Sequence, residues 1–174
     1  WPLEPTFYIP EEAGVHFHAA LARGEIRERE WKDKMEAYQK AHPQLFSQWN
    51  QWMNRELPEG WDRDLPAFAP DAKGMATRAA GSKVMNALAP HLPFMIGGSA
   101  DLNPSTNTTL KGKGNFQGPR KEETPVQGAE TGPWGYGGAN LHFGVREHGM
   151  GGILNGMALH GGVLPFGSTF LIFS

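Results

Sequence analysis

The sequence predicts an α/β protein in which a helical region precedes the start of a parallel β-sheet. In the first part, residues 1–68, charged residues and tryptophan are frequent, and apolar residues recur at helical spacing. In the second part, from about Gly74, short apolar runs bounded by glycine or proline alternate with helical patterns. Strands that alternate with helices form parallel sheets, which bind their ligands beyond the carboxyl ends of the strands.

The composition excludes several classes of protein. The 174 residues carry a formal net charge of -2, whereas nucleic-acid-binding proteins usually have a basic excess. The sequence has no cysteine for disulfides or thiolate metal sites, and no apolar run approaches the length of a membrane span. We therefore expect neither nucleic acid nor a membrane as a partner. Neither Trp1 nor Ser174 looks like a natural terminus, so we expect the chain to be a fragment.

Two helices are expected in the first part of the chain. Apolar residues at helical spacing run over residues 13–41, and Pro43 is placed to start a second helix that residues 57–60 would end. Residues 61–73, rich in aspartate and proline, have the character of a linker. We interpret residues 1–73 as one region, a solvated helical hairpin with its linker, which packs one face on a neighbour.

The second part, residues 74–174, is expected to hold the start of the sheet. We expect a helix over residues 75–88, a strand over 94–96 and a long loop over 103–138. A second strand over 140–143 and a helix over 147–159 follow, and a final strand over 163–169 enters a further helix. A loop of this length is uncommon unless it is functional or disordered. We expect residues 107–138 to be mobile, because they are rich in glycine and proline and lack apolar periodicity.

Three segments at strand ends carry polar or aromatic side chains: residues 97–102, 144–150 and 165–173. Taken singly, each segment has an ordinary structural explanation. Residues 97–102 can form an Asx-type turn, the acid in 144–150 can stabilise a helix start, and residues 165–173 can be a buried strand that enters a helix. Taken together, two polar loops and an aromatic cluster at the ends of parallel strands predict a shared crevice. A largely apolar pocket with one carboxylate suits a planar, polar aromatic ligand.

The same segments carry a family resemblance, which covers nearly the whole chain. The motifs are, in chain order, Ile9-Pro10-Glu11-Glu12, Leu57-Pro58-Glu59-Gly60-Trp61, Ala76-Thr77-Arg78, Gly97-Gly98-Ser99-Ala100-Asp101-Leu102 with Pro104-Ser105, Gly144-Val145-Arg146-Glu147-His148-Gly149-Met150 with Asn155-Gly156, and Thr169-Phe170-Leu171 with Phe173. They resemble the transketolase family of thiamine-diphosphate-dependent enzymes. The resemblance spans the end of that family's diphosphate-binding domain, the linker and the start of its pyrimidine-binding domain.

The resemblance implies an enzyme that reversibly transfers a two-carbon ketol unit from a ketose phosphate to an aldose phosphate. The carrier is thiamine diphosphate, bound with Mg²⁺ or Ca²⁺ between the two subunits of a homodimer. The family's Gly-Asp-Gly motif for the diphosphate and the metal does not occur in this sequence. We therefore expect the metal ligands to lie outside this chain and the chain alone to be inactive. The resemblance further implies a cytoplasmic or plastid-stroma enzyme of the pentose phosphate pathway or the Calvin cycle.

The resemblance assigns cofactor roles to five residues. Glu147 is the expected catalytic residue, which shares a proton with a ring nitrogen of the cofactor's aminopyrimidine. Phe173 packs on that ring, and Phe170 belongs to the same aromatic wall. Asp101 and Leu102 lie in the loop nearest the cofactor.

Two further residues, Arg78 and Ser105, match family residues that contact the substrate phosphate. Arginine suits a phosphate because its planar fork of donors is always charged. Ser105 adds a hydroxyl, which can donate a hydrogen bond to a phosphate oxygen. The expected site therefore combines cofactor and substrate contacts on one chain, with no metal ligand.

Other functions remain open from the sequence. A relative with the same cofactor domain, such as dihydroxyacetone synthase or deoxyxylulose-phosphate synthase, would share most motifs, but Arg78, Ser105 and the helical linker favour transketolase. A catalytically silent interaction module on the same scaffold is an alternative from another class, and the presence of Glu147 argues against it. Residues 111–138 depart from the family pattern, because this stretch is longer and richer in glycine and proline than expected.

Overall fold

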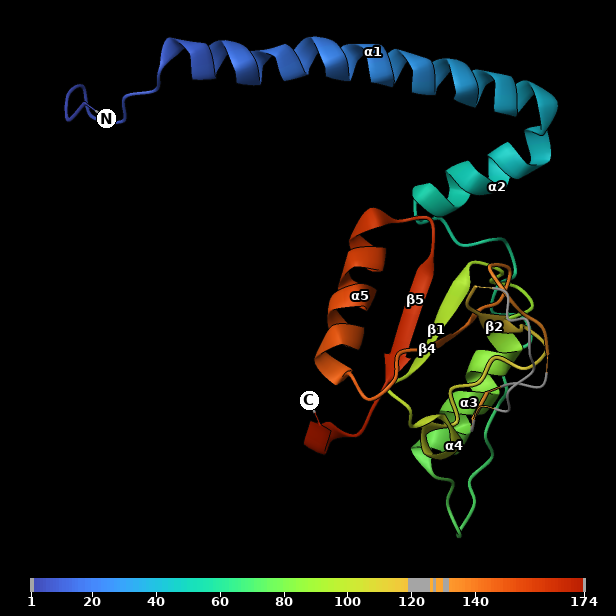
Figure 1. Ribbon diagram of the computed structural model, residues 1–174. Coiled ribbons are helices and arrows are strands. Elements are labelled where there is room, and N and C mark those ends of the chain that lie inside the picture. Colours follow the sequence, from blue (N-terminus) through green and yellow to red (C-terminus); the bar gives the residue numbers. More distant parts are fainter. Residues whose placement is uncertain (1, 119–125, 127, 130–131, 174) are drawn as a thin grey trace. The chain divides into compact units, whose positions relative to one another are not determined.

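The computed structural model of the chain describes residues 2–118, 126, 128–129 and 132–173. The chain folds as two compact units, Trp1–Gln48 and Trp49–Ser174. Figure 1 labels the helices and strands along the chain. The expected mobile loop, residues 107–138, lies partly outside the described residues.

The first unit consists mainly of one long helix, α1 (Glu11–Ala41). Two acidic residues in its first turn and Lys40 in its last turn complement the helix dipole. Glu28 and Lys32, one turn apart, form an ion pair at 2.7 Å. The hydrogen bond and charge of Lys32 lower the pKa of Glu28. No residue of α1 is buried, which agrees with the expected solvated helix.

The second helix, α2 (Pro43–Met53), begins at the predicted proline, but the predicted end of this helix is wrong. The sequence placed its end at residues 57–60, whereas the helix stops at Met53. Arg55 has a positive φ of 60°, a left-handed conformation that cannot continue a right-handed helix. A left-handed residue other than glycine has no clear sequence signature, which explains the error.

The second unit is built on a five-stranded, fully parallel sheet with the strand order β3-β2-β4-β1-β5. Its elements are α3 (Thr77–Leu88), β1 (Met95–Ser99), α4 (Asn103–Thr106), β2 (Asn115–Phe116), β3 (Trp134–Gly135), β4 (Asn140–His142), α5 (Glu147–His160), β5 (Leu164–Ser168) and the 3-10 helix η1 (Leu171–Phe173). The prediction of a parallel α/β sheet is confirmed. Where the sequence predicted a helix after the last strand, the described residues form this single 3-10 turn.

The stretch expected to be one unstructured loop, residues 103–138, contains α4, β2 and β3. The side chain of Asn140, in the neighbouring strand, holds part of it in place. Its Nδ2 group donates hydrogen bonds to the backbone carbonyls of Leu110 (2.9 Å) and Gly114 (2.8 Å), and its Oδ1 accepts one from the Leu110 N–H (2.8 Å). Because these bonds join distant residues, apolar periodicity cannot reveal them.

The central strand β1 contains two glycines that permit close contact with both neighbouring strands. A Cβ on Gly97 would collide with the carbonyl oxygen of Phe166 in β5, and one on Gly98 would collide with the carbonyl oxygen of Leu141 in β4. These obstacles are backbone atoms of paired strands, so a larger residue would have to push the strands apart. The close approach of the neighbouring strands therefore explains why β1 has glycine at both positions.

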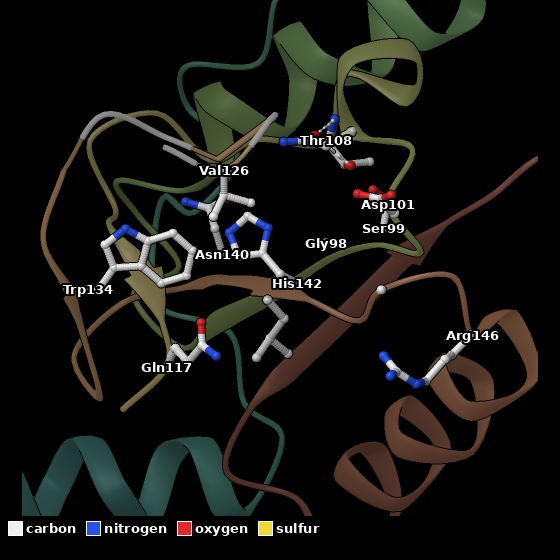
Figure 2. A pocket seen from close by; sticks show the side chains of 13 residues that line it. Gly98, Ser99, Asp101, Thr108, Gln117, Val126, Trp134, Asn140, His142 and Arg146 are labelled. Carbon is white, nitrogen blue, oxygen red and sulfur yellow. Dashed lines mark hydrogen bonds between the residues drawn. The ribbon is translucent and has the colours of Figure 1, made fainter. Parts of the chain in front are cut away.

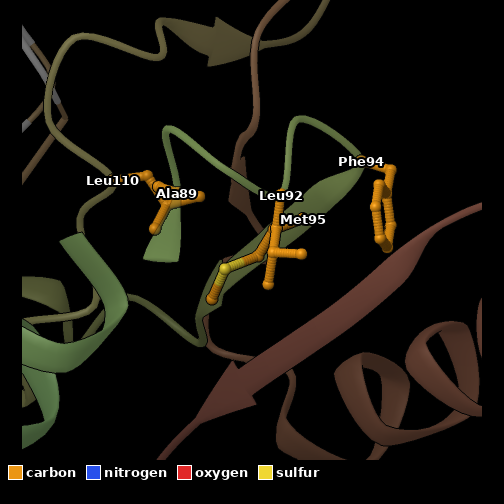
Figure 3. Close-up of a cluster of buried hydrophobic side chains, with 5 residues drawn as sticks. All are labelled: Ala89, Leu92, Phe94, Met95 and Leu110. Atoms are coloured by element: carbon orange, nitrogen blue, oxygen red, sulfur yellow. The ribbon is translucent and has the colours of Figure 1, made fainter. Parts of the chain in front are cut away.

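The larger core cluster lies where α3 turns into β1. It contains Ala89, Leu92, Phe94, Met95 and Leu110, as Figure 3 shows. Trp52, from the last turn of α2, packs on it with its ring 5.0 Å from that of Phe94. A smaller buried cluster contains Ala100, Phe143 and Met150. Ala100 directly follows β1, Phe143 directly follows β4, and Met150 lies in the first turn of α5, so the cluster joins that turn to the two strand ends.

Candidate functional site

The three segments singled out in the sequence leave the sheet at one edge. Residues 97–102 and 165–173 begin within β1 and β5, where the sequence had placed 97–102 after the strand, and residues 144–150 follow β4. The three segments lead to the starting points of α4, α5 and η1, respectively. In Figure 1 these three starting points lie at the same, lower end of the sheet. Ligands of parallel α/β sheets bind at this edge. The side chains of the segments, however, divide between two cavities.

The turn after β1 holds Asp101 in a left-handed conformation, with φ of 64°. Aspartate tolerates this region better than most residues. The buried hydroxyl of Ser99 accepts a hydrogen bond from the Leu102 N–H at 3.1 Å and closes the turn across Asp101. Leu102 in turn is the N-cap residue of α4. The Asp101 side chain is exposed.

The turn after β4 leads directly into α5, whose first residue is Glu147. Gly144 has a φ of 67°, and the Arg146 guanidinium donates a hydrogen bond to the Phe143 carbonyl at 3.0 Å. Glu147 is half-buried, and Met150 lies buried one turn further along the helix. The carboxylate thus sits on a rigid helix start rather than on a free loop.

The first cavity, of about 220 Å³, lies between the carboxyl ends of β1 and β4. Figure 2 shows its lining side chains, with Asp101 on the β1 side and Arg146 reaching in from the start of α5. On the far side the rings of Trp134 and His142 lie 5.1 Å apart, and His142 hydrogen-bonds to Asn115 at 2.8 Å. The cavity therefore has a polar, partly aromatic lining.

The second cavity, of about 650 Å³, lies among the start of α3, the end of α4 and the end of β5. Its lining is rich in hydroxyl groups and contains one charged side chain, that of Arg78. The hydroxyl-bearing residues are Thr77, Ser82, Ser105, Thr106, Thr108, Ser168 and Thr169. Phe166 and Phe170 provide an aromatic wall. An anionic, polyhydroxylated ligand matches this combination of groups.

The structure therefore brings together some of the predicted site residues and separates others. Arg78, Ser105 and Phe170 line the second cavity, and Asp101 lines the first. Glu147, Leu102 and Phe173 line neither of them. The Phe173 ring lies 6.1 Å from that of Phe170, and both rings are partly exposed.

Sequence reasoning missed most of the hydroxyl groups of the second cavity and the contact of Arg146 with the β4–α5 turn. Thr77 was detectable, because it directly precedes Arg78 at the start of α3. Ser82, one turn further along α3, follows from the same helical periodicity. The remaining hydroxyls come from other segments, and only the folded chain brings them to one cavity.

No group of three or more His, Cys, Asp or Glu side chains among the described residues could hold a metal ion. In the same part of the chain, no helix is both long and apolar enough to cross a membrane.

Comparison with known families decides the relationship. The profile of the transketolase pyrimidine-binding domain matches residues 73–174. The chain belongs to the transketolase family. The profile of the transketolase thiamine-diphosphate-binding domain matches residues 1–58. The resemblance noted in the sequence is thereby confirmed, and so is the start of a pyrimidine-binding domain in the second part of the chain.

Individual transketolases match the chain along its length. That of Geobacillus stearothermophilus is 42% identical over 100% of this chain and 24% of its own length. That of Aquifex aeolicus is 44% identical over 100% of this chain and 22% of its own. This chain thus spans 22–24% of the length of these relatives.

Solved transketolase structures resemble the fold. A transketolase from Pichia stipitis in complex with sedoheptulose 7-phosphate superposes with a TM-score of 0.78 and 35% identity, over 98% of this chain and 24% of that one. The transketolase of Leishmania mexicana gives 0.77 and 30%, over 98% and 23%. At these identities the likeness extends beyond the fold to the family.

Proposed function

We propose that this chain is part of a transketolase that transfers a two-carbon ketol unit from a ketose phosphate to an aldose phosphate. The observation that carries the proposal is the second cavity, where Arg78 stands among hydroxyl side chains beside Phe170. The alignment with transketolases along the whole of this chain supports it. The complete enzyme, below, means a polypeptide with this chain and the remaining length of its relatives.

In this proposal Arg78 and Ser105 bind the substrate phosphate. Both side chains are exposed at the rim of the cavity, where a phosphate can reach them from solvent. The guanidinium offers paired donors in a fixed plane, and the serine hydroxyl adds a neutral donor. The inner hydroxyls then face the sugar rather than the phosphate. The substrates are therefore sugar phosphates, bound with the phosphate near the opening of the cavity.

The residues present also fit thiamine diphosphate. Glu147 is a half-buried carboxylate on a helix start, and the paired rings of Phe170 and Phe173 lie after the neighbouring strand end. In the proposal these rings pack on the aminopyrimidine, while Asp101 and Leu102 form the loop beside it. When bound, the cofactor supplies the carbanion chemistry that carries the ketol unit.

The task of Glu147 is to share a proton with a ring nitrogen through its carboxylate oxygen. The carboxylate must hold this proton in a defined position. The buried side chain of Met150 anchors the first turn of α5 and so limits the movement of the Glu147 backbone. Glu147 is the residue to which we assign a catalytic role.

The diphosphate and its Mg²⁺ or Ca²⁺ are held outside this chain in the proposal. The motif by which the family binds the diphosphate and the metal does not occur in this sequence. We also retain the predicted division of the chain, with residues 1–73 as the helical end of the diphosphate-binding domain with its linker and residues 74–174 as the beginning of the pyrimidine-binding domain. We further propose a cytoplasmic or plastid-stroma enzyme.

We propose a homodimer with the site at the subunit interface. An apolar cavity of about 1070 Å³ lies along α5 and the sheet, lined in part by Trp49, Phe116, Ile153 and Met157. Ile153 itself is 52% exposed on α5. Exposed apolar side chains that gather at one cavity favour contact with another protein surface. A second subunit that covers it would also lie close to the start of α5.

The proposed function is tested by assaying the complete enzyme with thiamine diphosphate, Mg²⁺, a ketose phosphate and an aldose phosphate. We expect ketol transfer between the two sugars. A variant with Glu147→Gln serves as the control for the chemistry, and boiled protein as the control for contaminants. Absence of transfer by the folded, cofactor-loaded protein would contradict the proposal and favour the interaction module. Transfer to formaldehyde alone would favour dihydroxyacetone synthase.

A further inference from the structure

The turn between β4 and α5 is built around the side chain of Arg146. Its Nη1 atom donates a hydrogen bond to the Phe143 carbonyl at 3.0 Å. Its backbone N–H donates to the Gly144 carbonyl at 2.8 Å, and its own carbonyl accepts from the Met150 N–H at 2.7 Å. One residue therefore ties the end of β4 to the first turn of α5.

Gly144 accommodates this arrangement in two ways. Its φ of 67° bends the chain away from the strand, in a region that favours glycine. A Cβ at this position would also collide with the Arg146 guanidinium. A side chain at 144 would have to displace the guanidinium, which is the far end of a flexible side chain, so the positive φ is the stronger reason for glycine at this position.

Helix stability does not explain an arginine at this position. Arg146 is the N-cap residue of α5, and its side chain makes no capping hydrogen bond. Serine, threonine, aspartate and asparagine are the favoured N-caps, and a positive charge at this end opposes the helix dipole. A residue that breaks a local rule in this way marks a site where another requirement dominates. The residue that follows it is Glu147.

We propose that Arg146 is a positioning residue for Glu147. The inference rests on the proposed role of that glutamate. By fixing the Phe143 carbonyl and the first turn of α5, the guanidinium limits where the Glu147 carboxylate can lie. Proton sharing needs that carboxylate within a fraction of an ångström of its productive position. Loss of the bond from Arg146 loosens the turn, while the core residue Met150 keeps the helix in place.

The chain offers a matched control for this contact. Arg55 likewise donates from its guanidinium to a backbone carbonyl, in this case that of Ala158 within α5, at 3.2 Å. It braces the opposite end of the same helix. Replacing either arginine with methionine keeps most of the side-chain length and removes the charged donor. One variant releases the turn before α5, and the other releases the last turns of the helix.

The first measurement is backbone hydrogen exchange in the complete enzyme without cofactor. Arg146→Met should speed exchange of the amides of Met150 and Gly151, the first in α5 with helical acceptors, by about 3- to 10-fold, the effect of one ordinary hydrogen bond. Arg55→Met should leave these amides unchanged. Arg146→Lys, which can still donate one bond, should restore part of the protection. Equal exchange in wild type and Arg146→Met would overturn the proposal without any assay of activity.

The second measurement is a double-mutant cycle on proton exchange at the reactive carbon of thiamine diphosphate in the holoenzyme. Arg146→Met should slow this exchange and leave the KM for sugar phosphates unchanged. In a Glu147→Gln background it should have no further effect, because its action passes through that carboxylate. An equal further loss would show that Arg146 acts independently, which would overturn the inference.

The cycle also separates this inference from the proposed function. If Glu147→Gln itself exchanges at the wild-type rate, the proposed role of Glu147 fails, and the positioning role of Arg146 fails with it. If Glu147→Gln is slow but Arg146→Met is not, only the positioning role fails. Thermal unfolding of each variant, followed by circular dichroism, identifies any variant that does not fold. Arg146→Leu, which also lacks a donor, then takes the place of Arg146→Met if that variant fails this test.

Discussion

The Ser99 hydroxyl accepts a hydrogen bond from the backbone N–H of Leu102 at 3.1 Å, across the turn that holds Asp101. Ser99 is the last residue of β1 and is 4% exposed. The bond therefore closes a left-handed turn at the edge of the sheet where the candidate site lies. Ser99, which was not among the predicted site residues, thus holds the backbone of two residues that were, Asp101 and Leu102.

We expect Ser99→Ala to destabilise the chain by about 1–3 kcal/mol, because the partly buried N–H of Leu102 loses its acceptor. The measurement is urea denaturation of wild type and variant. Ser47→Ala is the control, since Ser47 is exposed on α2. Equal midpoints for the two variants would show that water replaces the Ser99 hydroxyl at no cost.

Asn140 should be more important for stability than any other polar side chain described above. Its amide makes three hydrogen bonds to the backbone of residues 110–114, and the residue is 3% exposed. Asn140→Leu keeps the volume but leaves the Leu110 N–H without its acceptor and removes the two side-chain bonds to carbonyls, so we expect a loss of about 2–5 kcal/mol. The measurement is again urea denaturation, with increased proteolysis near residues 110–114 as a second readout. Unchanged cleavage there would count against this role.

The sequence predicted the elements that local pattern determines. Strand β4 and helix α5, with Glu147 at the junction, follow from an apolar run, a glycine and a helical period. It did not predict β2 and β3, because these strands are two residues each and are too short to show an apolar pattern. Nor did it predict the contact of Asn140 with Leu110, because the two residues are 30 positions apart. Nor did it divide the site into two cavities, because that division depends on how far apart the turns after β1 and β5 lie in space.

Arg78→Ala in the complete enzyme should weaken the binding of phosphorylated substrates more than the binding of non-phosphorylated analogues. A charge-assisted hydrogen bond to phosphate contributes about 1.5–3 kcal/mol, or about 10- to 100-fold in binding. The measurement is KM for a ketose phosphate and for the same ketose without phosphate. Lys83→Ala is the control, because Lys83 lies on the same helix but packs near the Phe68 ring. Equal losses for both substrates would mean that Arg78 is structural.

The exposed apolar face of α5 leads to a prediction about assembly. Ile153 is 52% exposed and lines the apolar cavity proposed to lie under a second subunit. Ile153→Asp should therefore shift the complete enzyme from dimer to monomer, because association would bury the new charge without a partner. Sedimentation velocity at several concentrations measures the shift. Ile26→Asp, on exposed α1, is the control, and a dimer that survives Ile153→Asp would place the interface elsewhere.

Glu147 allows the sharpest separation of chemistry from structure. As the first residue of α5 it could act only as a helix-start acid, a role in which Gln would lose a few tenths of a kcal/mol to about 1 kcal/mol of stability. If it shares a proton with the aminopyrimidine instead, Glu147→Gln keeps the shape and removes the exchangeable carboxyl proton. We then expect proton exchange at the reactive carbon of the cofactor to slow by at least about 100-fold, without substrate present.

Two comparisons decide between these roles of Glu147. Glu147→Ala should be about as slow as Glu147→Gln, because both lack the carboxylate and differ mainly in packing. Glu11→Gln is the matched control, since Glu11 is likewise the first residue of a helix, α1, and should change only stability. The measurement is hydrogen–deuterium exchange in the complete enzyme with cofactor, quenched in acid and followed by NMR. If Glu147→Gln exchanges this proton at the wild-type rate, Glu147 is only a helix-start acid. The reason is that replacing the carboxylate with an amide slows the exchange only if the carboxylate shares a proton with the cofactor.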